Sequence, residues 1–256
     1  MDRTTLDSLF DLSGRTAIVT GGTRGIGLAL AEAYSCSGAN VVVASRKPDA
    51  CAAAARHLNT LGGRAIGVPT HTGDLDSLTA LVDAAVAEFG GVDIVVNNAA
   101  NPLTQRLGEF TPEAWAKSYE VNLRGPVFLV QAALPYLEKS EHAAVLNVIS
   151  AGAFMFSPTT AMYSAGKAAL LSYTRSMAAE FAPRGIRVNA LAPGSVNTDM
   201  VRNNPPEFVD AMAAASLQRR VADPDEMVGP ALLLTSDAGS FITGQVLLAD
   251  GGMVAH

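Results

Sequence analysis

Cysteine is scarce in this 256-residue chain, which contains only Cys36 and Cys51. Two thiols in Ala-rich stretches offer no metal-ligand spacing, and a chain of this length needs no disulfide framework to fold. We therefore expect packed, reduced thiols, no metal site and a reducing compartment.

Excess positive charge and long apolar runs are also lacking. The net charge of -6 and the pI of about 5.2 argue against non-specific binding to nucleic acid. No apolar run approaches the ~18 residues that span a membrane. The N-terminal segment "MDRTTLDSLFDLSGR" has acidic residues and no apolar core, so we expect no signal peptide and a cytoplasmic protein.

Short β-branched runs and longer helical patterns alternate along the chain. Nearly every position in these runs is apolar, as in strands buried on both faces of a parallel sheet. The pattern predicts an α/β fold: a Rossmann-like, doubly wound, parallel seven-stranded sheet with helices on both faces. No repeat or linker interrupts it, so one domain over residues 1–256 is expected. The predicted strands are 16–20, 40–44, 65–69, 93–97, 145–149, 187–191 and 245–249.

Several helix ends are marked by capping residues. An amphipathic pattern over 78–89 is followed by Gly90, a typical stop signal. Thr111 before a proline predicts an N-cap, with Trp115 beginning the apolar face. Asp223 and Glu226 are spaced to form a capping box.

Residues 202–208, "RNNPPEF", contain two consecutive prolines. A proline restricts the backbone of the residue before it, which disfavours helix there. This segment is therefore predicted to be a surface loop or a lid hinge.

The segment "TGGTRGIG" (20–27) follows the first predicted strand and opens a helical pattern. Gly21, Gly25 and Gly27 would allow a tight turn and the close approach of a pyrophosphate to a helix N-terminus. A purely structural turn is the alternative, but this position after the first strand favours a nucleotide site.

The stretch "YSAGK" holds Tyr163 and Lys167 four residues apart. On a helix this spacing places both side chains on one face, about one turn from each other. An ammonium group near a phenol favours the phenolate, which suits a proton donor and acceptor. Such a pair also occurs by chance, so the motif needs support from the rest of the chain.

That support is a set of motifs in a fixed order. "NNAA" (97–100) ends the fourth predicted strand, Asn122 lies in "VNLRG", Ser150 precedes Tyr163 by 13 residues, and "PGSVNT" (193–198) follows the sixth strand. With the glycine loop, these motifs resemble the ~250-residue branch of the short-chain dehydrogenase/reductase family over nearly the whole chain. Within that family, the chain is similar to the NADP-dependent carbonyl and 3-oxoacyl reductases.

The resemblance implies a catalytic set of Asn122, Ser150, Tyr163 and Lys167. Tyr163 would exchange a proton with the substrate oxygen, and Lys167 would favour its phenolate and hold the nicotinamide ribose. Ser150 would donate a hydrogen bond to the same oxygen. Asn122 would anchor a water that links Lys167 to solvent, or would only be the amide of a helix kink.

The resemblance also implies cofactor contacts at the carboxyl ends of several strands. Asn97 would tie neighbouring strands or face the ribose, and Ala100 adds a methyl group where the family usually has glycine. Val196 and Thr198 would meet the carboxamide of the nicotinamide. The expected contacts are Gly21, Thr23, Arg24, Gly25, Ile26, Gly27, Ser45, Arg46, Lys47, Asn98, Ala99, Ala100, Tyr163, Lys167, Pro193, Gly194, Val196 and Thr198.

The residues after the second strand favour NADP(H) over NAD(H). Ser45 stands where NAD-dependent members carry an aspartate, and the cations Arg46, Lys47 and Arg24 can accompany a 2′-phosphate. A solvated basic turn is the alternative. His71 occupies a position where the family often has an aspartate beside the adenine, and its role is left open between structural and ligand-binding.

The substrate side is marked only by apolar residues near the reacting groups: Phe154, Met155, Phe156, Met162, Met200 and Val201. They suit an apolar ketone or alcohol, and equally suit a core or a subunit contact. The alternative is a 3-oxoacyl thioester on a carrier protein or CoA. Against a carrier protein, "EKSEHAAV" before the fifth strand is acid-rich, although Arg184 is present. A non-catalytic dinucleotide sensor is a remote third reading.

The segment 168–182 is apolar almost all round, more than one buried face requires. The last strand and tail, 245–256, are apolar as well. The resemblance implies a tetramer, which is common in the family, and together with these features it predicts a homotetramer with two kinds of two-fold interface. A monomer with an ordinary buried helix is the alternative.

Overall fold

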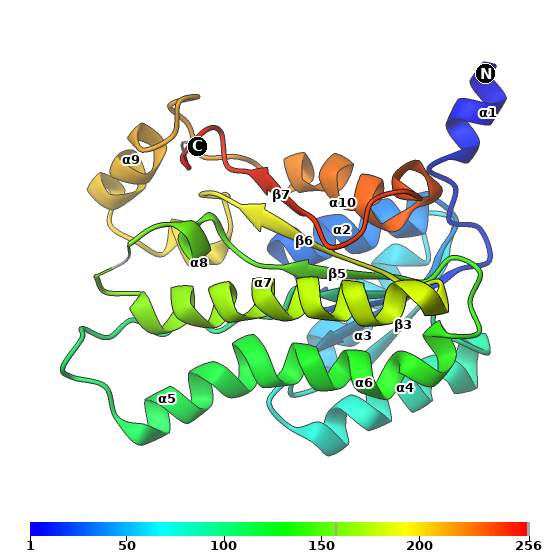
Figure 1. Cartoon of the computed structure of the whole chain (residues 1–256), viewed down its shortest axis with the longest axis horizontal. Coiled ribbons are helices and arrows are strands. Elements are labelled where there is room, and N and C mark those ends of the chain that lie inside the picture. The colour runs from blue at the N-terminus through cyan, green and yellow to red at the C-terminus, as the bar shows by residue number, and fades with distance from the viewer. Residues whose placement is uncertain (157, 255–256) are drawn as a thin grey trace.

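A computed structural model describes residues 1–156 and 158–254. Its core is a seven-stranded sheet in which every neighbouring pair of strands is parallel, in the order β3-β2-β1-β4-β5-β6-β7 (Figure 1). This confirms the predicted Rossmann-like α/β fold. The strands are β1 (Thr16–Thr20), β2 (Asn40–Ser45), β3 (Arg64–Pro69), β4 (Ile94–Asn97), β5 (Ala144–Val148), β6 (Arg187–Pro193) and β7 (Val246–Ala249).

Helices cover both faces of the sheet (Figure 1). One apolar cluster joins the sheet to α2, α3 and α10, and a second joins its other face to α4, α6 and α7. The α-helices are α1 (Arg3–Ser8), α2 (Gly25–Cys36), α3 (Pro48–Leu58), α4 (Leu75–Phe89), α5 (Pro112–Tyr119), α6 (Gly125–Leu137), α7 (Ala161–Phe181), α8 (Asp199–Arg202), α9 (Pro206–Ala214) and α10 (Val228–Thr235). The shorter helical turns are η1 (Glu120–Arg124), η2 (Ala151–Phe154), η3 (Ala182–Arg184), η4 (Pro224–Met227) and η5 (Asp237–Gly239).

The predicted helix ends are confirmed. Gly90 ends α4 in the left-handed region with φ 86°. The Thr111 side chain accepts a hydrogen bond from the Ala114 N–H at the start of α5. Asp223 and Glu226 form the capping box of η4, which leads into α10. The expected apolar role of Trp115 is wrong, because this residue is 49% exposed and stacks on Tyr119 instead of entering the core.

The predicted surface loop over residues 202–208 is present only at 203–205, and the prediction is wrong at both ends of that range. Two helices nearly meet there: α8 ends at Arg202 and α9 begins at Pro206. Proline is tolerated at the first helical position because the N–H it lacks would have no partner within the helix. Pro205 precedes the helix in an extended conformation, as the residue before a proline prefers. Of the two cysteines, Cys51 is buried as expected but Cys36 is exposed.

The chain reverses its direction of winding between β1 and β4, which are neighbours in the sheet. The Thr20 hydroxyl ties their carboxyl ends together: it donates to the Val96 carbonyl at 3.1 Å and accepts from the amides of Asn98 and Ala99. Open α/β sheets bind ligands at such a switch point, so this edge is where a site is expected.

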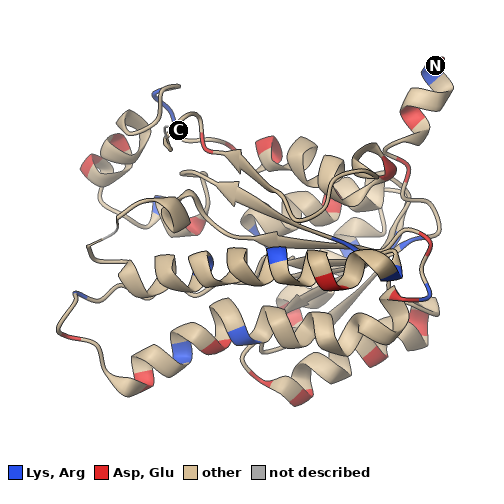
Figure 2. Cartoon of the chain, viewed as in Figure 1, with Lys and Arg blue, Asp and Glu red and all other residues tan. Residues whose placement is uncertain are grey.

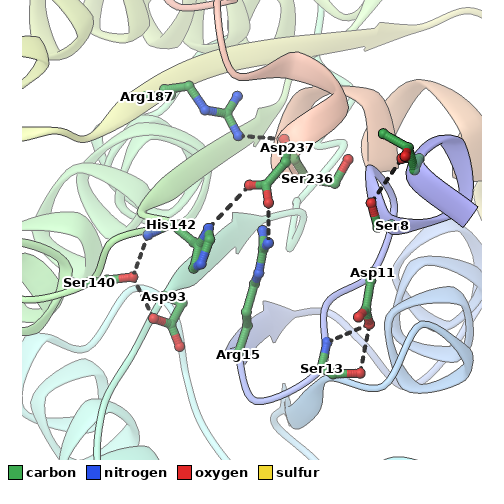
Figure 3. Close-up of polar contacts among 11 residues, drawn as sticks. Ser8, Asp11, Ser13, Arg15, Asp93, Ser140, His142, Arg187, Ser236 and Asp237 are labelled. Carbon is green, nitrogen blue, oxygen red and sulfur yellow. Dashed lines mark hydrogen bonds and ion pairs between the residues drawn. The ribbon is translucent and has the colours of Figure 1, made fainter. Parts of the chain in front are cut away.

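The opposite edge of the sheet, at the amino ends of the strands, carries a polar cluster (Figure 3). Arg15 lies 2.6 Å from the Asp237 carboxylate, which also contacts the His142 ring at 3.1 Å. The Arg187 guanidinium donates to the main-chain carbonyls of four residues: Leu234, Ser236, Gly239 and Ile242. This cluster joins α10 and η5 to the beginnings of β1 and β6.

In the view of Figure 2, charges of both signs are interspersed along α5 with η1 and along α7, whereas α4 carries acidic residues only. Over the described residues, no helix combines the length and apolar character needed to cross a bilayer. No group of three or more His, Cys, Asp and Glu side chains in the same residues is placed to hold a metal ion.

Candidate active site

Tyr163 and Lys167 lie one turn apart near the start of α7. The Lys167 ammonium is 5.7 Å from the centre of the Tyr163 ring, and the lysine is only 1% exposed. Its Nζ donates a hydrogen bond of 2.7 Å to the Val148 carbonyl at the end of β5. Within residues 1–156 and 158–254, no carboxylate lies within ion-pair distance of this ammonium.

Burial shifts the proton affinity of both groups. It raises the pKa of Tyr163 to about 12, while a hydrogen bond with the Ser150 side chain acts the other way. Burial also lowers the pKa of Lys167 to about 8. Without a ligand, Tyr163 therefore holds its proton firmly, and additional positive charge is needed to make its phenolate accessible near neutral pH.

Ser150 lies two residues beyond β5 and caps η2, where its Oγ accepts from the Gly152 N–H at 3.1 Å. Its hydroxyl is thus fixed between the end of β5 and the start of α7. The structure brings Ser150, Tyr163 and Lys167 together at one site, as the sequence predicts.

Asn122 is fully buried in η1, a single π-helical turn between α5 and α6. Its side-chain oxygen accepts from the Asn101 N–H and its amide donates to the Asn101 carbonyl, both at 2.8 Å. The amide also reaches Ser118 at 3.2 Å. Asn122 therefore holds the loop after β4, a contact that sequence reasoning missed; its expected role towards a water is still a prediction.

The loop after β4 has a second anchor at Gln105. Its N–H donates to the Thr159 carbonyl at 3.0 Å, just before α7 begins. Asn101 thus fixes this loop to η1, and Gln105 fixes it beside the start of the helix that carries Tyr163.

The glycines of the loop stand at positions where a side chain would be strained or would clash. Gly21 and Gly25 have φ of 66° and 53°, a region that favours glycine. A Cβ on Gly27 would lie 2.2 Å from the Gly21 carbonyl oxygen, so only glycine fits. Thr23, Arg24 and Ile26 complete the turn into α2 at the switch point, which fits a phosphate cradle.

The two asparagines at the end of β4, Asn97 in the strand and Asn98 directly after it, both stabilise the framework. Asn97 is buried and donates to the Asn147 side chain at 2.9 Å, so of its two expected roles the tie between strands is seen. Asn98 donates from its amide to the Thr20 carbonyl at 2.9 Å, which braces the glycine loop. Ala99 and Ala100 follow, half-buried, at the same edge.

The end of β2 presents the expected cations. Ser45 lies 3.2 Å from the Cys51 thiol, and Arg46 and Lys47 are exposed. Neither cation forms an ion pair with any residue in 1–156 or 158–254. Arg24 differs, because its guanidinium pairs with Asp199 at 2.9 Å.

The segment after β6 reaches back to the glycine loop. A Cβ on Gly25 would lie 3.0 Å from the Thr198 methyl group. Pro193 ends the strand, and a Cβ on Gly194 would lie 2.7 Å from the Asp250 main chain. Val196 is 3% exposed and bridges to Ala222.

His71 folds back on its own turn, with Nδ1 accepting from the Gly73 N–H at 3.2 Å. This contact is structural. A contact between His71 and the adenine is not tested by it and stays open.

Five of the six apolar residues near the site divide into two groups, and the sixth, Phe154, is half-buried and packs against the core. Met162 and Val201 are 2% and 8% exposed and belong to the interior. Met155, Phe156 and Met200 are exposed, at 40%, 91% and 46%. Only the exposed group is free to meet a substrate or another subunit.

Comparisons with known proteins agree with this geometry. A family model described as "Enoyl-(Acyl carrier protein) reductase" matches residues 21–254. The human protein named "Dehydrogenase/reductase SDR family member 4" is 37% identical over 244 residues, 94% of this chain and 88% of that protein. "Cis-4-hydroxycyclohexanecarboxylate dehydrogenase" of Sinomonas cyclohexanicum is 38% identical over 243 residues, 94% of this chain and 97% of that protein.

Among solved structures, one from Agrobacterium tumefaciens C58 has a TM-score of 0.91 and 35% sequence identity. The match covers 96% of this chain and 97% of that one. It is titled a 3-oxoacyl (acyl-carrier-protein) reductase with NADP bound.

Proposed function

The chain belongs to the short-chain dehydrogenase/reductase family of oxidoreductases, and we propose that it transfers a hydride between NADP(H) and a carbonyl or secondary-alcohol substrate. It would work as one dinucleotide-binding domain. The observation that carries the proposal is the buried Lys167 ammonium, which has no carboxylate partner among the described residues and lies beside the Tyr163 ring at the carboxyl edge of the sheet.

The residues of the site have separate tasks. Ser150 and Tyr163 hydrogen-bond the substrate oxygen, and Tyr163 gives its proton to that oxygen during reduction or takes it back during oxidation. Lys167 stabilises the phenolate that forms, because its positive charge lies in a poorly solvated place. When bound along the glycine loop, the nicotinamide cofactor supplies or accepts the hydride.

The preference for NADP(H) is supported by Arg46 and Lys47, exposed cations without an ionic partner in the described chain, and by Ser45, which brings no negative charge. We expect NADPH to bind at least ten times more tightly than NADH, a difference of about 1.4 kcal/mol. Titration of both cofactors against the protein measures it. Ser45→Asp combined with Arg46→Ile should reverse the preference, and equal binding by the parent protein would overturn it.

An apolar ketone is the proposed substrate class, supported by the exposed Met155, Phe156 and Met200. A 3-oxoacyl thioester is the second candidate, because the similar structure from Agrobacterium tumefaciens is titled as such a reductase. Absorbance of NADPH, followed over a panel of ketones, diketones and 3-oxoacyl thioesters, separates the two. Binding of NADPH with no turnover on the whole panel would favour a non-catalytic sensor.

We also propose a cytoplasmic homotetramer. The support is that Phe128 on α6 and Tyr173 on α7 remain 37% and 46% exposed on neighbouring helices of an apolar region. Light scattering behind size exclusion at micromolar concentration tests the assembly. A mass near 26.4 kDa, one chain, with NADPH present would overturn it.

A further inference from the structure

We infer that Asp199 competes with the cofactor phosphate for Arg24 and so weakens the preference for NADPH. The inference rests on the proposed function, in which Arg24 is one of the cations that accompany the 2′-phosphate. Asp199 itself belongs to neither the proposed catalytic set nor the proposed cofactor contacts.

The ion pair joins the glycine loop to the segment that follows β6, two parts of the proposed cofactor site. Arg24 is the residue before α2, at the end of the glycine loop, and its side chain is 75% exposed. Asp199 is the first residue of α8, after the segment that follows β6. The two segments are also in contact at the neighbouring residues, where Gly25 faces the Thr198 methyl group.

Asp199 is shared between two arginines. Its Oδ2 accepts from Arg24 at 2.9 Å, and its Oδ1 accepts from Arg202 at 2.8 Å. Arg202 also donates to the Asn197 carbonyl at 3.1 Å, which holds it on the α8 side. The hydrogen bond from Arg202 is the main cause that lowers the pKa of Asp199; burial acts the other way, and the charges of Arg24 and Arg202 lower the pKa further.

An incoming phosphate can displace this carboxylate. The pair is exposed, so solvent screens it and it stabilises the fold only slightly. A phosphate monoester carries more negative charge than a carboxylate and offers three acceptor oxygens. Arg24 must nevertheless leave Asp199 first, whereas Arg46 and Lys47 have no ionic partner to leave among the described residues.

Measured affinities test the competition. Asp199→Asn should tighten NADPH binding about threefold, the scale of an exposed ion pair, and should leave NADH binding unchanged. Arg202→Gln should have the opposite effect, because it leaves Asp199 with Arg24 as its only cation among the described residues. Arg24→Gln should weaken NADPH binding, and adding Asp199→Asn to it should then change nothing.

The matched control is Glu88→Gln on α4, which removes the acid of another exposed pair, formed with Arg64 of β3 at 2.8 Å. An equal gain for Glu88→Gln and Asp199→Asn would mean a long-range charge effect and would overturn the inference. The inference also fails if Asp199→Asn changes nothing while Arg24→Gln weakens NADPH binding, and the proposed cofactor preference then stands. If the parent protein binds both cofactors equally, the proposed preference itself fails.

Discussion

At the amino ends of the strands, the Arg187 guanidinium donates to four main-chain carbonyls, whereas at the carboxyl ends the Lys167 ammonium donates to one. Both cations lose solvation by burial, and in both cases burial lowers the pKa. The nearby charge of Asp237 acts against this shift at Arg187, whereas no carboxylate pairs with Lys167 in the part of the chain that the structure describes.

The difference separates a cation that holds structure from one that is available for chemistry. A buried charge whose hydrogen bonds are all satisfied stabilises the segments that it joins, and it has few donors free to interact with a ligand. A buried charge with few partners acts strongly on whatever forms beside it, since the medium screens it poorly. The Tyr163 phenolate would form beside such a charge, the Lys167 ammonium.

The largest expected effect belongs to the carboxyl end. Tyr163→Phe removes the transferable proton and keeps the ring, so turnover should fall about 10²–10⁴-fold while cofactor affinity stays within about twofold. Steady-state rates and NADPH titration measure both quantities. Tyr173→Phe on the same helix, at a 46% exposed position, is the control and should keep the parent rate. A Tyr163 variant with more than about a tenth of the rate would contradict an acid role for this residue.

The second test is directed at the amino end. Arg187→Met leaves four carbonyls without their donor and should lower the free energy of unfolding by about 2–4 kcal/mol. The turnover of the folded fraction should be retained. Denaturant unfolding measures the loss, with Arg184→Met, which breaks an exposed pair with Glu138, as a control costing about 1 kcal/mol or less. Equal losses for the two variants would remove the contrast between the ends.

The smallest effect concerns Lys167 and pH. Its pKa is about 8 in the folded chain, below the ordinary lysine value of 10.5 that applies to the unfolded chain, so between these limits the unfolded chain binds more protons. Stability contributed by this residue therefore rises with pH through that window. From pH 8 to 10 the parent should gain about 2 kcal/mol relative to Lys167→Met.

The pH dependence of stability must be measured for the parent and for Lys167→Met, because other groups also titrate in this range. Burial raises the pKa of Tyr34 and of Tyr163, which lowers stability as the pH rises above about 10, so the comparison ends at pH 10. The exposed Lys117→Met serves as the control, and its curve should run parallel to that of the parent. Parallel curves for Lys167→Met as well would show that the ammonium is not poorly solvated.

The sheet was predictable because strands buried on both faces need continuous apolar sequence, and each predicted strand lies within two residues of the observed one at either end. Local caps such as Thr111 and Gly90 were predictable for a similar reason, since the signal lies within a few residues. The grouping of Ser150 with Tyr163 and Lys167 followed from motif order and the resemblance to a family.

Contacts between distant segments could not be predicted in this way. Arg24 and Asp199 are 175 residues apart, and the sequence around either residue does not indicate that the other lies within hydrogen-bond distance. The motif "VNLRG" identifies Asn122, but it does not predict the hydrogen bonds between its side chain and the Asn101 main chain, which depend on the π-helical turn η1. The exposure of Trp115 and Cys36 depends on which helix faces find a neighbour, and helical spacing alone does not specify this.

The hydrogen bond from Lys167 to Val148 uses a main-chain oxygen and no side chain of β5. Any amino acid at position 148 supplies that oxygen, so descendants of this protein can vary the residue, within the limits of core packing, without losing the acceptor. Only a shift of the strand by insertion or deletion would remove it. Evolution must therefore keep the identity of residue 167, but at position 148 it must keep only the position of β5 relative to α7. A mutant library at position 148 should retain turnover in every variant that still folds.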